Sequence, residues 1–155
     1  MTFKSAAITA SVSLPLAILI IIYIYINLLK HDGIFKTKAE LQEAVNNYHF
    51  ILSASSYQPI NEWDTSLITD MSNLFVNNTD FNEDISNWDT SSVTNMESMF
   101  MNLKSFNHSV SNWNTSSVTN MESMFHNCSS FNNGNENLTF DTSSVTSMKS
   151  MFENA

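Results

Sequence analysis

The chain has 155 residues, a formal net charge of −9, one cysteine, two glycines and no arginine. From residue 61 onward it contains 12 acidic residues and two lysines, so this part repels phosphate backbones and nucleic-acid binding is not expected. The single cysteine excludes a disulfide framework within the chain and a thiol-based zinc site. The scarcity of glycine argues against a fold built on tight glycine turns.

The first predicted element is a single-pass membrane helix within residues 1–30. The stretch from Ala6 to Leu29 has no charged residue. A helix of that length extends about 36 Å, enough to cross the roughly 30 Å apolar layer of a bilayer. The apolar run is long for a cleaved signal peptide, and no small-residue cleavage site follows it. We therefore expect an uncleaved signal anchor.

The orientation of this anchor depends on the charges around it. Lys4 precedes the span, whereas Lys30, Lys36 and Lys38 follow it. Counted alone, this bias would place the C-terminal part in the cytoplasm. The imbalance is small, so both orientations stay open on charge.

Residues 31–60 are predicted to form a linker and an amphipathic capping helix. Thr37 and Glu40 have the spacing of a capping box, in which each side chain accepts from the other residue's backbone N–H. The apolar residues that follow recur at helical spacing: Leu41, Ala44, Val45 and Tyr48. A stack of repeats needs an end unit that shields its first core face, and we assign this helix that role. A separate partner-binding helix is the alternative.

Residues 61–155 contain about four copies of one motif, the last incomplete. The copies are Trp63–Phe75, Trp88–Phe100, Trp113–Phe125 and Phe140–Phe152. Their starts are 25, 25 and 27 residues apart, which predicts a two-residue insertion around residues 133–135. Self-similarity at a fixed period of this length is typical of stacked repeat proteins.

The apolar residues of the copies fall in register. The columns are Ile68, Val93, Val118 and Val145; Met71, Met96, Met121 and Met148; Leu74, Met99, Met124 and Met151; Phe75, Phe100, Phe125 and Phe152; and Phe81, Phe106 and Phe131. One repeat buries too little apolar surface to fold alone, so neighbouring coils must stack. We expect a repeat solenoid. Each coil should hold a short strand at the position of residues 84–89 and a short helix at that of residues 96–100.

The stretch Ile85–Phe100, ISNWDTSSVTNMESMF, resembles the 25-residue repeat of the BspA-like leucine-rich-repeat surface proteins, which include mycoplasma lipoproteins. The resemblance extends from about Asn61 to Ala155. It implies a leucine-rich-repeat-like solenoid exposed on a cell surface, with binding or adhesion roles and no catalytic residues to transfer. The chain departs from the pattern in its membrane anchor, which stands in place of a lipidated cysteine, and in having few repeats.

Tryptophans open the first three motif copies and are the leading candidates for ligand contact. Trp63, Trp88 and Trp113 either belong to the core, which we favour because large aromatics contribute much of the burial energy of small cores, or form an exposed ladder that could stack on sugar rings. Asp64 and Asp89 follow two of them. Short polar side chains at such positions most simply serve turns, although contact with a ligand is the alternative.

No catalytic, cofactor or metal site is expected. Asp80, Asn82 and Asp84 have the spacing of a calcium-loop start, but Ile85 and Ser91 occupy the positions that require glycine and glutamate. For Cys128 we expect a small side chain in a repeat loop, with an intermolecular disulfide as the alternative. His108 and His126 have no partner at ligand spacing.

These observations predict a non-enzymatic, membrane-anchored surface protein that binds or adheres to a protein or glycan partner, with its repeats outside the cell. The alternative is a membrane-tethered scaffold that faces the cytoplasm. The sequence ends at Ala155, just after the fourth Met-Phe pair. We expect either a fragment of a longer repeat protein or end-to-end self-association through an uncapped last repeat.

Overall fold

The structure is a computed structural model that describes residues 33–51, 58–76 and 78–155, with side chains described for all of these except residues 49–51. The chain divides into two compact units, residues 1–30 and 31–155, and every described residue belongs to the second. The predicted span from Ala6 to Leu29 lies outside the described residues. Within the described ranges, no helix is both long enough and apolar enough to cross a membrane.

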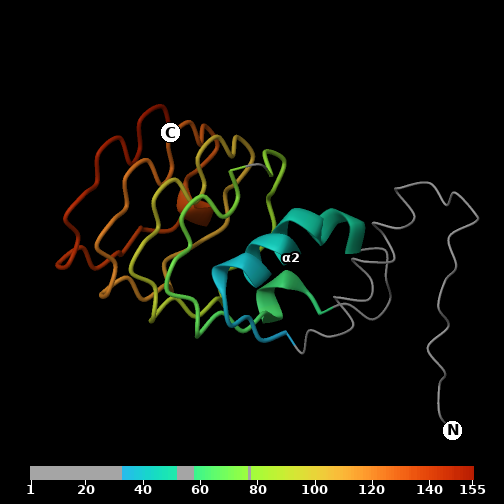
Figure 1. Cartoon of the computed structure of the whole chain (residues 1–155). Coiled ribbons are helices and arrows are strands. Elements are labelled where there is room, and N and C mark those ends of the chain that lie inside the picture. The colour runs from blue at the N-terminus through green and yellow to red at the C-terminus, as the bar shows by residue number, and fades with distance from the viewer. Residues whose placement is uncertain (1–32, 52–57, 77) are drawn as a thin grey trace, which may run out of the picture. The chain divides into compact units, whose positions relative to one another are not determined.

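The helix α2 comprises Lys38–Ile51 and starts at the predicted capping box. The N–H of Glu40 donates to Thr37 Oγ1 (3.3 Å), and the Glu40 carboxylate accepts from the N–H of Thr37 (3.2 Å). The apolar stripe predicted for this helix is buried and joins the core of the repeats: Leu41, Ala44, Val45 and Tyr48. The predicted helix and its capping box are therefore confirmed, and α2 packs against the first repeat (Figure 1).

The repeats form four coils that lie side by side (Figure 1). We number them from the N-terminal end as coil 1 (residues 63–87), coil 2 (88–112), coil 3 (113–139) and coil 4 (140–155). Parallel bridges join the same position of successive coils: Asp70 to Asn95, Asn95 to Asn120 and Asn120 to Ser147. The short 3-10 helix η1, Ile60–Glu62, leads into coil 1. The segment before α2 is tied to coil 1 by a parallel bridge between Ile34 and Asp64.

The secondary structure inside each coil differs from the expected strand and helix. Residues 84–89 were expected to form a strand, but a turn at Ser86 and Asn87 interrupts them, and the N–H of Trp88 donates back to the carbonyl of Ile85 (3.1 Å). This turn points Ile85 and Trp88 to the same side, so both are buried. The pairing between coils falls further along the chain, at the isolated bridge of Asn95.

Residues 96–100 were expected to form helical turns, and this expectation is wrong. Ser98 has φ of +53°, and the equivalent Ser123 and Ser150 have +55° and +54°. A left-handed residue breaks a right-handed helix. The conformation turns the N–H groups of Met96, Ser98 and Phe100 toward the next coil, where they find acceptors. Hydrogen bonding between coils thus replaces hydrogen bonding along a helix.

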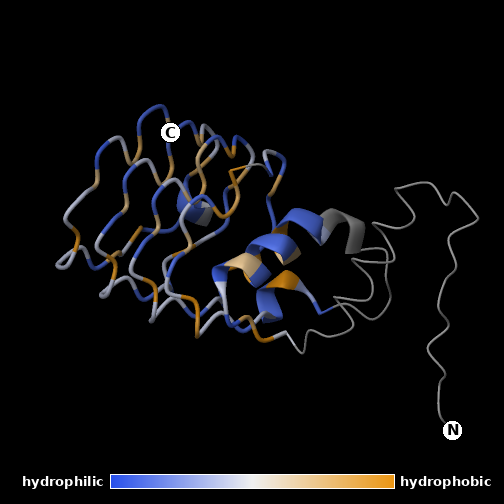
Figure 2. Ribbon diagram, viewed as in Figure 1, coloured by the Kyte–Doolittle hydropathy of each residue, from blue (hydrophilic) through white to orange (hydrophobic). Residues whose placement is uncertain are grey.

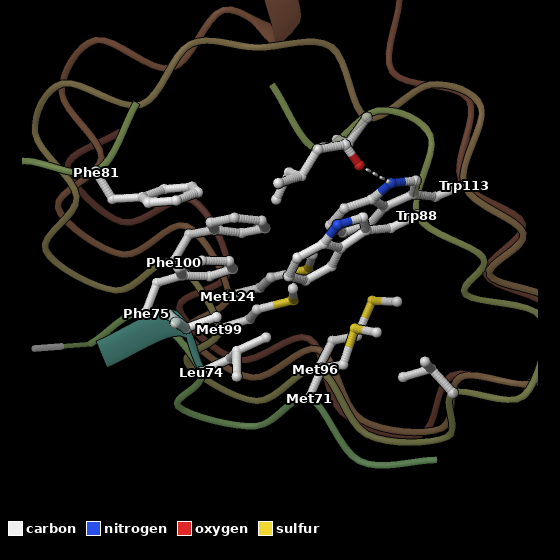
Figure 3. Close-up of a cluster of buried hydrophobic side chains, with 14 of the residues drawn as sticks. Met71, Leu74, Phe75, Phe81, Trp88, Met96, Met99, Phe100, Trp113 and Met124 are labelled. Carbon is white, nitrogen blue, oxygen red and sulfur yellow. Dashed lines mark hydrogen bonds between the residues drawn. The ribbon is translucent and has the colours of Figure 1, made fainter. Parts of the chain in front are cut away.

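Hydrophobic residues recur at matching places in successive coils (Figure 2), and side chains of the same type lie over one another (Figure 3). The rings of Phe75, Phe100 and Phe125 are stacked at 5.4 and 5.2 Å between centroids, nearly parallel. Met71, Met96 and Met121 are fully buried in the next column. These columns are the ones that the sequence predicts. Within a coil the rings also stack, as Phe100 does on Phe106 (4.5 Å), so each coil buries its apolar side chains both against its neighbours and within itself.

The two extra residues of the last interval lie where the sequence places them. The N–H groups of Asn132 and Gly134 both donate to Asn107 Oδ1 (2.6 and 3.3 Å), so the spacing between coils changes from 25 to 27 residues at this point. The 3-10 helix η2, Asn133–Asn135, contains the change, and Gly134 has φ of +62°. The insertion is absorbed locally, because Asn133 is buried and its Oδ1 accepts from the N–H of Val110 (2.8 Å).

Candidate binding surface

The tryptophans predicted as candidate ligand contacts belong to the core. Trp63, Trp88 and Trp113 are only 3%, 3% and 4% exposed. The indole N–H of Trp88 donates to the carbonyl of Ile60 (2.7 Å), and that of Trp113 donates to the carbonyl of Ile85 (3.2 Å; Figure 3). Each of these indoles therefore ties its coil to the segment one repeat earlier. An exposed aromatic ladder is excluded by this burial, and the alternative that we favoured from the sequence is confirmed.

The acidic residues after the tryptophans are exposed and make turns. Asp64 Oδ1 accepts from the N–H of Ser66 (3.0 Å), and Asp89 Oδ1 accepts from the N–H of Ser91 (2.9 Å). The same contact recurs at the equivalent positions of coils 3 and 4, Asn114 and Asp141. Because an amide replaces the carboxylate at Asn114, the turn needs an acceptor oxygen and not a charge. The result is a column of exposed side chains in one fixed orientation.

Hydrogen bonds from serines lower the pKa of several aspartates. The side chain and the N–H of Ser66 hold the pKa of Asp64 below its usual range. The N–H and the hydroxyl of Ser143 do the same for the pKa of Asp141. For Asp70, partial burial opposes ionisation, but bonds from Ser72 and Lys38 outweigh it and the pKa is lowered. These carboxylates are charged at neutral pH, so the exposed column is negative.

Buried threonines join neighbouring coils just inside this column. The hydroxyl of Thr65 donates to the carbonyl of Asp89 (2.9 Å), and that of Thr90 donates to the carbonyl of Asn114 (3.0 Å). Thr115 repeats the contact with Asp141 (3.0 Å). The three threonines are at most 1% exposed. A hydroxyl inside an apolar stack requires such a partner, since an unpaired one would be costly to bury.

A second threonine column lies on the surface. The hydroxyl of Thr94 donates to the carbonyl of Thr69 (3.1 Å), and that of Thr119 donates to the carbonyl of Thr94 (3.1 Å). Thr146 makes the same bond to Thr119 (2.9 Å). These residues are exposed, yet each hydroxyl group donates a hydrogen bond to the preceding coil.

Asparagines form a further ladder at positions with positive φ. Asn127 Nδ2 donates to Asn102 Oδ1 (2.9 Å), and Asn154 Nδ2 donates to Asn127 Oδ1 (3.1 Å). Their φ values are +67°, +60° and +59° in chain order, a conformation that asparagine tolerates better than most residues. These asparagines and the surface threonines were not predicted as a structural feature. The signal that could have found them is the recurrence of identical polar residues at the repeat period.

Among the side chains that the structure describes, Cys128, His108 and His126 do not form a reactive site. Burial raises the pKa of Cys128 to about 11, and its Sγ donates to the carbonyl of Phe100 (2.8 Å). This buried thiol cannot reach another chain, which rules out the alternative of an intermolecular disulfide. His126 Nδ1 lies 3.7 Å from Glu153 Oε2. Among the described residues, no three His, Cys, Asp or Glu side chains are placed to hold a metal ion.

Comparison with known protein families gives a match over most of the chain. The family described as Mycoplasma protein of unknown function, DUF285, matches residues 39–155, a range that contains all four coils and nearly all of α2. No curated protein and no solved structure matches the chain.

Proposed function

Since this chain belongs to the family described as Mycoplasma protein of unknown function, DUF285, we propose that it is a non-enzymatic binding or adhesion protein of the cell surface. In this proposal residues 6–29 anchor the chain in the membrane, and the coils face outward to contact protein or glycan partners. The long uncharged segment supports the anchor. The resemblance of the repeats to surface proteins supports the outward orientation.

The stack of coils is, in this proposal, a leucine-rich-repeat-like solenoid of the BspA type. Its support is the 25-residue interval between equivalent hydrogen bonds, such as those from Thr94 to Thr69 and from Thr119 to Thr94. The residues that are identical at equivalent positions of successive coils make the contacts between coils. The coil shape would therefore be shared among relatives, while exposed positions remain available for different partners.

The column of exposed turn residues is the observation that carries the binding proposal. Asp64, Asp89, Asn114 and Asp141 are exposed, and each orientation is fixed by a bond to the N–H two residues later. A partner with repeated cationic or hydroxyl groups would meet the same side-chain type once per coil. Several weak contacts in register raise the overall affinity through effective concentration.

Protease treatment of intact cells tests the outward orientation. Cells would express the full chain with a C-terminal epitope tag, and lysed cells would serve as the control. We expect the tag to be lost from intact cells. Protection in intact cells with loss after lysis would overturn surface display and support the cytoplasmic scaffold, the orientation that Lys30, Lys36 and Lys38 favour by charge.

Charge-neutral variants test the binding column itself. Asp64→Asn and Asp89→Asn keep the turn acceptor, as Asn114 does naturally, but remove two negative charges. With the tagged chain on protein and glycan arrays, we expect these variants to lose signal relative to wild type. Glu136→Gln, which changes an exposed acid outside the column, is the matched control. Equal signal for all variants would show that the column is not the contact surface.

A further inference from the structure

The insertion in coil 3 contains the chain's one Asn-Gly pair, Asn133–Gly134. Asparagine before glycine is prone to deamidation, because glycine has no Cβ to hinder the approach of its nitrogen to the asparagine side chain. In this reaction the glycine nitrogen bonds to Cγ of the asparagine, the bond from Cγ to Nδ2 breaks, and ammonia leaves with the proton of the glycine N–H. Water then opens the succinimide ring to aspartate or isoaspartate.

The side chain that would react joins coil 3 to coil 2. Asn133 is only 3% exposed, and its amide makes three hydrogen bonds. Oδ1 accepts from the N–H of Val110 in coil 2 (2.8 Å), and Nδ2 donates to Ser111 Oγ of the same coil (2.7 Å). Nδ2 also donates to the carbonyl of Glu136 (3.2 Å). The bonds to Nδ2 hold the nitrogen that has to leave as ammonia.

The nitrogen that would attack is held against coil 2 as well. The N–H of Gly134 donates to Asn107 Oδ1 (3.3 Å), and an amide oxygen is too weak a base to remove this proton. The backbone of Gly134 lies so close to coil 2 that a Cβ there would come within 3.2 Å of the nitrogen of Ser109. The burial of Asn133 also keeps away the water that hydrolysis requires. The closed contact between coils 2 and 3 therefore protects the pair.

The products of deamidation fit this contact worse than asparagine does. An aspartate at position 133 keeps an acceptor for the N–H of Val110 but offers no N–H to the carbonyl of Glu136. Its negative charge would be buried, and none of the three groups that bond this side chain is cationic. Isoaspartate would lengthen the main chain inside η2. Either product therefore favours the open form of the contact.

We propose that Asn133–Gly134 is a deamidation site that the contact between coils 2 and 3 keeps closed, and that its reaction permanently loosens this contact once it has opened. Opening precedes the chemistry, so the rate of deamidation follows the population of the open form. Ammonia is lost to the solvent, and closing the contact again does not restore the amide. The junction between coils 2 and 3 therefore has a chemical lifetime that its own stability sets.

Peptide mass spectrometry of the full chain, incubated in detergent micelles at mildly alkaline pH, tests the protection. We expect conversion at Asn133 to be at least about tenfold slower in the folded chain than in denaturing urea. Ser111→Ala and Asn107→Ala each remove a bond that closes the site and should speed conversion, whereas Ser117→Ala, at an exposed position of coil 3, should not. Equal rates in the folded and denatured chain, or no acceleration in folded Ser111→Ala and Asn107→Ala, would overturn the proposal.

Tryptophan fluorescence reports whether each variant folds, since all three indoles are buried. The loosening is tested with Asn133→Asp, which carries the product side chain, and with Asn132→Asp as the matched control, which places the same charge at the exposed neighbouring residue. We expect Asn133→Asp to lower the urea midpoint of unfolding by about 1 M relative to Asn132→Asp, because a buried group loses its partner. Failure of Asn133→Asp alone to fold is the same result in stronger form. Equal midpoints for the two variants would overturn the proposal.

Discussion

A buried threonine hydroxyl joins each neighbouring pair of coils, and its loss should be measurable. Thr90→Val keeps the side-chain shape but leaves the carbonyl of Asn114 without this donor. We expect the free energy of unfolding to fall by about 1–2 kcal/mol, the usual cost of an unpaired buried polar group. Chemical denaturation measures this change. Ser117→Ala, at an exposed position, should be close to neutral, and an equal effect at both sites would argue against the buried ladder.

The aspartate turns should make the stack sensitive to acid. The folded-state pKa values of Asp84 and Asp141 are lowered, in each case chiefly by a bond from the backbone N–H two residues later. Their contribution to stability is therefore present above the unfolded pKa of about 3.9 and is lost as pH falls through the lower folded values. The double variant Asp84→Asn, Asp141→Asn keeps both acceptors and should lose less stability between pH 5 and pH 2 than wild type. Parallel pH profiles would contradict this expectation.

At the scale of elements, a left-handed serine distinguishes the observed turn from a helix. Ser123 has φ of +55°, a conformation that favours glycine over residues with a Cβ by roughly 1 kcal/mol. We expect Ser123→Gly to be more stable than Ser123→Ala. A helix would reverse this order, because glycine is about 1 kcal/mol worse than alanine inside one. Thermal unfolding of the two variants under the same conditions shows which of them is more stable.

The helix α2 should stabilise mainly the coil that it covers. Leu41 is fully buried in the cluster shared with the repeats, and Leu41→Ala should cost about 2–5 kcal/mol locally. Coupling in stacked repeats passes between neighbours, so amide exchange should accelerate at Met71 and Phe75 more than at Met121 and Phe125. Exposed Glu43 provides the control through Glu43→Ala. Uniform acceleration along the stack would contradict the local role.

The capping helix could be read from the sequence because its signals are local. Thr37 and Glu40 are three residues apart, and the apolar stripe after them has helical spacing. The strand and helix expected within each coil were wrong because apolar spacing was interpreted as local structure. Met96, Met99 and Phe100 are apolar because they line a column between coils, while Ser98 adopts a positive φ that no spacing reveals.

At the scale of the whole molecule, the repeat period alone predicted which side chains share a column. It also located the insertion at residues 133–135, because a longer interval between two motif copies can be recognised without knowing the fold. The direction of the hydrogen bonds between coils could not be predicted. It depends on which peptide groups turn toward the next coil. The residues with positive φ, such as Ser98, set that orientation. The candidate tryptophans illustrate the same limit, since the burial of Trp88 depends on the turn at Ser86 and Asn87 and that of Trp113 on the equivalent turn at Ser111 and Asn112.

Residue-resolved amide exchange of the full chain in detergent micelles tests the hydrogen bonding between coils most directly. We expect strong protection at the N–H groups of coils 2 and 3 that donate to the next coil: Met96, Ser98, Phe100, Asn102, Met121, Ser123, Phe125 and Asn127. Exposed residues of the same two coils whose N–H groups donate to no other coil among the described residues should exchange quickly: Asp89, Asn112 and Ser117. Protection confined to the first set supports coils that are joined by their backbones. Equal exchange of the two sets would contradict it.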